Sequence, residues 1–121
     1  MLHKVAVYGT LRKGQRNHYL LEQADYLFDD YIAGTLSNLG GCPAFHIDPT
    51  DLDLVKVEVY EVDQTTLYDL DRLEGHPYMY KRIKVKLFNK EIQSYTYLYQ
   101  DSIHNLPFIR SGDWVKYYGM D

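Results

Sequence analysis

The chain has 121 residues, 45% hydrophobic and 25% charged, which suits one globular domain spanning residues 1–121. Its 13 basic and 17 acidic residues give a formal net charge of −4, and this balance excludes the basic face that a nucleic-acid-binding protein needs. The one cysteine excludes an intrachain disulfide. Because the N-terminus also lacks a signal-peptide core and no apolar run reaches membrane-spanning length, we expect a cytoplasmic protein with no membrane partner.

The first predicted element is a buried strand over the apolar run 2–8, which Gly9 stops. Gly9 and Gly14 bracket a loop, and Asn17 is then expected to cap a short helix that continues to about Ala24. A glycine directly after a buried strand lets the backbone turn sharply and expose N–H groups that can bind a carboxylate or an oxyanion. The loop is therefore a candidate binding element, although it has neither the Walker nor the dinucleotide-binding spacing.

The next stretch predicts strands separated by turns. Residues 26–36 are interrupted by two aspartates, so we expect two short strands or one bent strand that ends before Asn38. Glycine and proline predict a loop at 39–43, and a second turn cluster lies at 48–51. The clearest alternation of apolar and polar residues covers 54–62, which predicts a half-buried strand.

A helix and a long hairpin follow. Asp63 is placed to cap a helix that ends at Glu74, because leucines recur at helical spacing and the next residue is a glycine. Alternation resumes over 78–88 and 92–99, two strands joined by a short turn, and the tail 101–121 is expected to be irregular with one short helix. This order implies an α+β fold whose strands are numerous enough to form a small, mostly antiparallel β-barrel flanked by helices.

Glu74 is the first candidate for chemistry. It lies at the C-terminal end of the predicted helix, where the helix dipole disfavours a carboxylate by about 0.3–1 kcal/mol and where Lys or Arg is usual. A carboxylate in such a place tends to have a raised pKa, which suits a general acid or base that works near neutral pH. Position alone does not distinguish this role from that of an ordinary solvated glutamate.

Other reactive side chains point to no further site. Cys42 is interpreted as a small packed hydrophobe rather than as a nucleophile paired with His46. None of the five histidines stands at metal-ligand spacing from another, so we expect no metal. The 13 tyrosines are interpreted mainly as strand formers, with a tyrosine-lined pocket or a dimer interface left open. We expect a monomer or a weak homodimer.

Several segments, in this order, resemble the γ-glutamylcyclotransferase-like superfamily, especially its γ-glutamylamine cyclotransferase and AIG2-like branch. Residues 7–18, V-Y-G-T-L-R-K-G-Q-R-N-H, are similar to the opening signature of the family. Residues 70–82, L-D-R-L-E-G-H-P-Y-M-Y-K-R, resemble the branch motif L-D-x-x-E-G-x-P-x-x-Y-x-R. Between them, 34–36 with 42–43 resemble the pocket-lining strand and proline loop, and 57–62 resemble the G-E-V-Y strand with valine in place of the glycine.

The family site corresponds to named residues of this chain. Its substrate-binding loop corresponds to four consecutive residues: Tyr8, Gly9, Thr10 and Leu11. Its catalytic glutamate corresponds to Glu74. From the Y-x-R spacing, Tyr80 is expected near the pocket as a substrate-binding residue, with a hydroxyl that is a candidate to orient Glu74. Arg82, on the same face, is expected to buttress the strand.

The resemblance implies cyclisation of the γ-glutamyl group of a γ-glutamyl amine or amino acid to 5-oxoproline, with release of the amine. The substrate's own α-amine is the nucleophile, so a small γ-glutamyl compound is the implied partner and no metal or cofactor is needed. The alternative is a binding module of the same fold that holds a γ-glutamyl or acidic small metabolite without turnover. A third hypothesis is a structural adaptor that contacts its partners through exposed tyrosines. The sequence does not identify the leaving amine.

Overall fold

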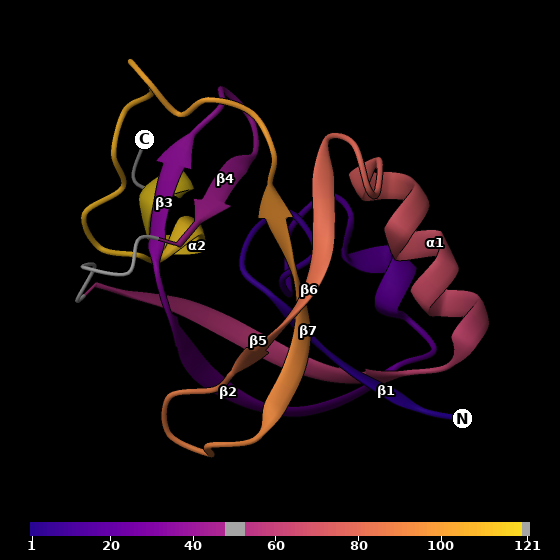
Figure 1. Ribbon diagram of the computed structural model, residues 1–121. Helices are drawn as coiled ribbons and strands as arrows, with labels where there is room; N and C mark the ends of the chain where they lie inside the picture. The colour runs from indigo at the N-terminus through magenta and orange to yellow at the C-terminus, as the bar shows by residue number, and fades with distance from the viewer. Residues whose placement is uncertain (48–52, 120–121) are drawn as a thin grey trace.

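The computed structural model describes residues 1–47 and 53–119, and these contain seven strands, two α-helices and one 3₁₀ helix (Figure 1). The strands are β1 (His3–Val7), β2 (Asp25–Ala33), β3 (Thr35–Asn38), β4 (Pro43–His46), β5 (Leu54–Val62), β6 (Tyr80–Lys86) and β7 (Gln93–Tyr99). The helices are η1, the 3₁₀ helix (His18–Leu21), α1 (Gln64–Glu74) and α2 (Trp114–Tyr118). The turn predicted at 48–51 lies outside the described residues.

Five strands form one sheet in the order β2-β5-β1-β7-β6, and β3 pairs with β4 in a separate antiparallel hairpin. Neighbouring strands of the large sheet are antiparallel except β1 and β7, which run parallel with Val5 opposite Tyr95. Strand β1 is therefore in the middle of the sheet although it is first in the chain. Figure 1 shows α1 along one side of this sheet and α2 close to β3, where Asn38 donates to the Tyr117 hydroxyl. The expected α+β fold is confirmed.

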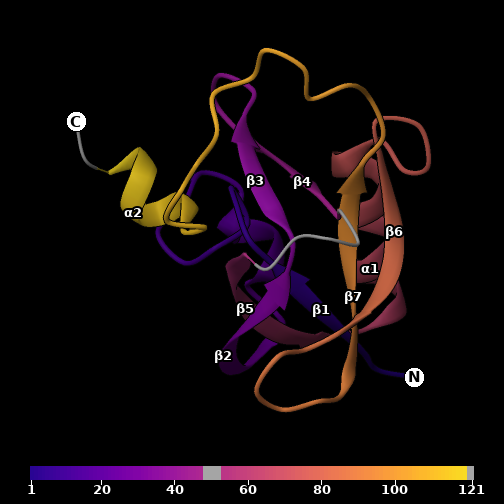
Figure 2. The ribbon, with the colours of Figure 1, turned by 60° about the vertical axis from the view of Figure 1, so that its left-hand side comes forward.

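A closed β-barrel, by contrast, is not confirmed. Within the described residues, β2 and β6 remain the two edges of the large sheet. The sheet curls until the β6–β7 turn reaches β2 (Figures 1 and 2), and there the Phe88 amide donates to the Tyr31 carbonyl oxygen at 2.8 Å. A turn bridges the two edges in place of a ladder of paired strands, so the sheet is curled and open.

The two aspartates do not interrupt the second strand. Strand β2 runs unbroken for nine residues, with one register shift between Tyr26 and Phe28. Asp30 is buried, but its carboxylate accepts from the amides of Asn89 at 2.9 Å and Lys90 at 3.0 Å, so it fixes the β6–β7 turn. Burial alone would raise the pKa of Asp30; the hydrogen bonds from these amides outweigh burial and lower it. A buried charge satisfied in this way is tolerated within a strand.

Strand β5 has the predicted bounds, but it is buried on both faces along its second half. Val55, Val57 and Val59 belong to one core cluster, while Tyr60 and Val62 belong to a second cluster that packs under α1. The prediction of a half-buried strand is therefore wrong, because each face of this central strand carries its own core. The second cluster is the one that seats α1 against the sheet.

The start and end of α1 follow the sequence signals. The Asp63 side chain accepts from the Thr66 amide at 2.8 Å, and Gly75 ends the helix in the left-handed conformation. The helix expected after Asn17 is only the short η1; Nδ2 of the Asn17 side chain donates to Thr10 Oγ1, and the side chain does not cap the helix. No helix among the described residues is long and apolar enough to cross a membrane.

Candidate active site

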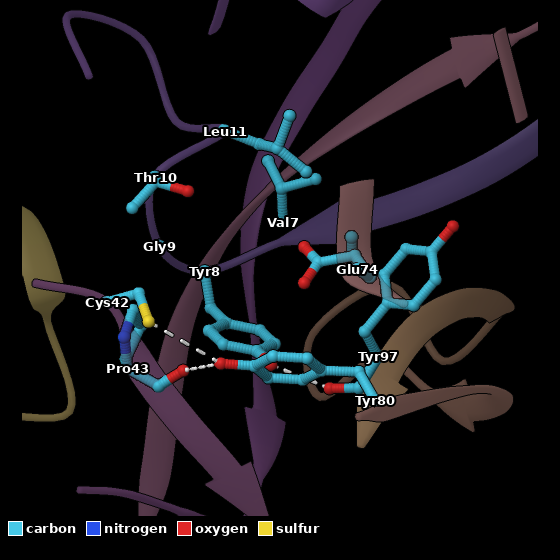
Figure 3. A pocket seen from close by; sticks show the side chains of 11 residues that line it. Val7, Tyr8, Gly9, Thr10, Leu11, Cys42, Pro43, Glu74, Tyr80 and Tyr97 are labelled. Atoms are coloured by element: carbon cyan, nitrogen blue, oxygen red, sulfur yellow. Dashed lines mark hydrogen bonds between the residues drawn. The ribbon is translucent and has the colours of Figure 1, made fainter. Parts of the chain in front are cut away.

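One pocket collects the residues that the sequence singles out (Figure 3). It lies between the loop after β1, the C-terminal end of α1, the start of β4, and strands β6 and β7. Its walls are formed by Ala6, Val7, Tyr8, Gly9, Thr10, Leu11, Cys42, Pro43, Glu74, Tyr80 and Tyr97. The space between them is about 330 Å³ with the open mouth included, and the centre of a water molecule can move through about 30 Å³ of it. The pocket is therefore narrow and open at its mouth, which suits a small ligand.

The backbone of the loop after β1 is fixed through its carbonyl groups. The carbonyl oxygens of residues 9, 10, 11 and 12 all accept hydrogen bonds, at 3.0, 3.0, 2.8 and 3.0 Å. The donors, in the same order, are the amides of Arg12 and Asn17, Nδ1 of His18 and the amide of Gln15. The amides of Gly9, Thr10 and Leu11 donate to no other group in the described part of the chain. Three consecutive open N–H groups on a fixed backbone form a potential anion cradle.

Gly9 is required by close contact with the opposite wall of the pocket. A Cβ added to Gly9 would lie 2.6 Å from Cγ and 2.8 Å from Cδ of Pro43, closer than real Cβ atoms come. The backbone of Gly9 is not in the left-handed region. What glycine provides here is therefore the absence of a side chain rather than an unusual backbone angle. Pro43, buried at the start of β4, sets the width of the pocket.

Glu74 is the last residue of α1, and its carboxylate points across the pocket toward the loop (Figure 3). Burial raises the pKa of Glu74 from 4.5 to about 7. No side chain or amide in the described residues donates a hydrogen bond to this carboxylate, so nothing offsets the cost of ionising it there. The C-terminal end of the helix dipole acts in the same direction. Glu74 is therefore able to exchange a proton near neutral pH.

Three tyrosines, Tyr8, Tyr80 and Tyr97, line the pocket beside Glu74. Burial raises the pKa of each above 10.0, so all three remain neutral. Their hydroxyl groups donate, respectively, to the Tyr97 carbonyl oxygen at 2.7 Å, the Pro43 carbonyl oxygen at 2.7 Å and Asp71 Oδ1 at 2.6 Å. The expectation that the Tyr80 hydroxyl orients Glu74 is therefore wrong, because its proton is directed to the opposite wall. Tyr80 lines the pocket and braces β4.

An ion pair behind Tyr97 joins α1 to β6. Asp71, one helical turn before Glu74, lies 3.4 Å from Nη1 of Arg82 through its second oxygen, Oδ2. The Arg82 guanidinium also lies over the Tyr95 ring, 4.6 Å from its centroid. Arg82 thus buttresses its strand as expected, and it does so by fixing the helix end that carries Glu74.

The sequence alone missed parts of the pocket wall. Tyr97 and its partner Asp71 come from segments 26 positions apart, and no local pattern connects them. Cys42 lines the pocket, with its Sγ 3.8 Å from the Tyr80 hydroxyl, instead of packing in the core. His46 contacts the Thr35 hydroxyl. Within residues 1–47 and 53–119, no group of three or more potential metal ligands gathers.

A narrow pocket that sets open amides opposite one carboxylate of raised pKa is an arrangement that can bind a small molecule and exchange a proton with it. Residues 5–116 match the family described as gamma-glutamyl cyclotransferase, AIG2-like, and the chain belongs to this family. The resemblance seen in the sequence is thereby confirmed.

Relatives match over nearly the whole chain. A protein of Methanocaldococcus jannaschii, provisionally named a gamma-glutamylcyclotransferase, is 34% identical over 119 residues, which cover 95% of this chain and 98% of the relative. A Vibrio cholerae protein with the same provisional name is 37% identical over 119 residues, with coverage of 96% and 98%. The crystal structure of an uncharacterised Pyrococcus horikoshii protein superposes with a TM-score of 0.81 at 29% identity, covering 96% of this chain and 92% of that one.

Proposed function

We propose that this protein is a γ-glutamyl cyclotransferase that converts the γ-glutamyl group of a γ-glutamyl amine or amino acid into 5-oxoproline and releases the amine. The observation that carries the proposal is the pairing, in one narrow pocket, of Glu74, with its pKa of about 7, and the three open amides of residues 9–11. Membership of the family supports the class of reaction.

Binding supplies much of the rate in this proposal. The α-amine of the substrate attacks the γ-carbonyl carbon of the same molecule, so the reaction needs a folded-back substrate rather than a second reactant. Holding such a conformer is worth up to about 7–11 kcal/mol in well-oriented intramolecular reactions. The narrow walls favour a compact substrate, and the amides of Gly9, Thr10 and Leu11 bind the substrate carboxylate or the oxyanion that develops on the γ-carbonyl oxygen.

Glu74 moves the protons. The α-nitrogen starts as an ammonium with three protons and ends as a lactam N–H with one, so it loses two. The departing nitrogen starts with one proton and leaves as an ammonium with three, so it gains the same two. Glu74 accepts the first proton to free the nucleophile and passes it to the departing nitrogen as the C–N bond breaks; the second follows the same path. The carboxylate is regenerated, and the reaction consumes no water.

The test is release of 5-oxoproline from a panel of γ-glutamyl amines and γ-glutamyl amino acids. We expect turnover of at least one class. Binding of 5-oxoproline or of γ-glutamyl compounds without any release across the panel would contradict the proposed activity and favour the non-catalytic binding module. Absence of both binding and release would contradict both.

A further inference from the structure

Arg12 directly follows the substrate loop, residues 8–11, but does not line the pocket. Only 5% of its surface is exposed, and its guanidinium lies between two carboxylates. Nε donates to Glu58 Oε2 at 3.0 Å and Nη1 donates to Asp113 Oδ1 at 2.7 Å. One side chain thus joins the loop to strand β5 and to the residue that caps α2, 101 positions away.

Glu58 holds the same loop at a second point. Its other oxygen, Oε1, accepts from the Lys13 amide at 2.8 Å and from the Tyr60 hydroxyl at 2.9 Å. Strand β5, which carries Glu58, is paired with β2 on one side and β1 on the other. The side chain of residue 12 and the main chain of residue 13 are therefore attached to a strand that is paired on both of its sides.

Asp113 brings the C-terminal part of the chain into this arrangement. Besides binding Arg12, its Oδ1 accepts from the Lys116 amide at 3.2 Å, and the adjacent Trp114 is fully buried. The Lys56 amide donates to the Gly112 carbonyl oxygen at 2.8 Å, which attaches the segment to β5. Burial alone would raise the pKa of Asp113, but the hydrogen bond from Arg12 outweighs it, and the pKa is lowered. The carboxylate is therefore charged at neutral pH.

A buried ionic cluster of this kind adds little net stability compared with apolar side chains of similar volume, but it does fix geometry. Hydrogen bonds to the carbonyl oxygens of residues 9–12 already give the loop its internal shape. The side chain of Arg12 and the amide of Lys13 attach this loop to the rest of the fold, and so set where its open amides lie. We propose that Arg12 is a positioning residue for these amides and that Asp113 helps to fix the Arg12 guanidinium in place. The inference rests on the proposed function for what the amides bind, and it makes the start of α2 a support of the active site.

The test uses variants that are expected to keep the fold and to weaken the attachment of the loop to β5 and to the start of α2. Asp113→Asn preserves the helix cap, since Asn caps as well as Asp, and removes the charge that faces Arg12. Arg12→Lys keeps the charge but lacks the planar fork that bridges two carboxylates. Asp63→Asn is the matched control, because it makes the same change at the cap of α1, away from the loop.

We expect kcat/KM to fall about 10²-fold in Arg12→Lys and about tenfold in Asp113→Asn, as for a displacement of binding groups by about 1 Å. Asp63→Asn should stay within about twofold of wild type. The pH midpoint set by Glu74 should not move in any variant, whereas a general loosening of the pocket would shift it. Thermal melts establish that each variant is folded at the assay temperature.

A second measurement needs no substrate. The ¹⁵N order parameters of the Gly9, Thr10 and Leu11 amides should fall from about 0.85 toward 0.6 in Arg12→Lys and Asp113→Asn, and stay unchanged in Asp63→Asn. Unchanged order parameters in both loop variants, or unchanged kcat/KM in both, would overturn the positioning role. If the wild type shows no turnover, the proposed function fails, while the order parameters still decide what Arg12 does.

Discussion

Replacing Glu74 by glutamine separates the proposed chemistry from the stability of the fold. Glutamine keeps the shape of the side chain but cannot accept a proton usefully near neutral pH. If Glu74 is the proton carrier, 5-oxoproline release should fall by about 10²–10⁴-fold, the usual contribution of general acid–base catalysis. Binding of 5-oxoproline should persist or tighten, because its carboxylate no longer meets a second negative charge in the pocket.

The same substitution should stabilise the protein at high pH. Burial raises the pKa of Glu74 from 4.5 to about 7 in the folded protein. The folded state therefore holds this proton more tightly than the unfolded state, and stability is lost as the pH rises from about 4.5 through 7. The cost is complete above pH 7 and amounts to at most about 3 kcal/mol, less to the extent that solvent reaches the half-buried carboxylate.

The two effects are measured on the same samples. Release of 5-oxoproline gives the rate, and chemical denaturation at pH 8 and at pH 4 gives the free energy of unfolding. Glu74→Gln should exceed wild type in stability at pH 8 and equal it at pH 4. Glu22→Gln, which neutralises an exposed glutamate, is the control and should change neither. Full turnover in Glu74→Gln would remove Glu74 from the mechanism, and equal stability at pH 8 would refute the raised pKa.

Further expectations follow from the same geometry. In wild type, kcat/KM should rise with pH to a plateau with a midpoint near 7, the pKa of Glu74; a rate that is flat from pH 5 to 9 would speak against this residue. Gly9→Ala should cost about 1–3 kcal/mol in denaturation and much of the activity, because its Cβ would overlap Pro43; Pro43→Ala in the same chain should restore part of the stability. Asp30→Asn should destabilise by about 1–3 kcal/mol at pH 7. Because the folded pKa of Asp30 is lowered, that loss should shrink as the pH falls through it, and a pH-independent loss in denaturation would contradict the charge-based account.

Local signals in the sequence predicted the elements that position the site. Asp63 and Gly75 mark the two ends of α1 through a cap and a left-handed glycine, and both act within one helical turn. The alternation that predicts the strand over 54–62 is an equally local signal, and so is the glycine at position 9 that ends the first strand. Together with the family motifs, these signals predict a site made of Glu74 and residues 8–11, and the structure brings all of them, with Tyr80, to one pocket.

What the sequence did not reveal depends on contacts between distant segments. Asp30 looked like a strand breaker because nothing nearby shows that the amides of residues 89 and 90 will satisfy it. Strand β5 looked half-buried because its polar face includes Glu58 and Tyr60. In the fold, Glu58 is buried and paired with Arg12, and Tyr60 belongs to a second core. The Tyr80 hydroxyl was assigned to the wrong partner because Pro43 approaches it only in the folded chain.

The central place of β1 in the sheet has a consequence for how the protein is made. The Thr96 hydroxyl donates to the Ala6 carbonyl oxygen across 90 positions, and the Tyr8 hydroxyl reaches the Tyr97 backbone across 89. At a synthesis rate of about 5–20 residues per second, β1 waits roughly 5–18 s on the ribosome before β7 exists. During that interval one edge of the nascent sheet is open to pairing with other chains. The arrival of β7 closes this edge and adds Tyr97 to the wall of the pocket, so the strand that ends the exposure of β1 also supplies the last lining residue of the site.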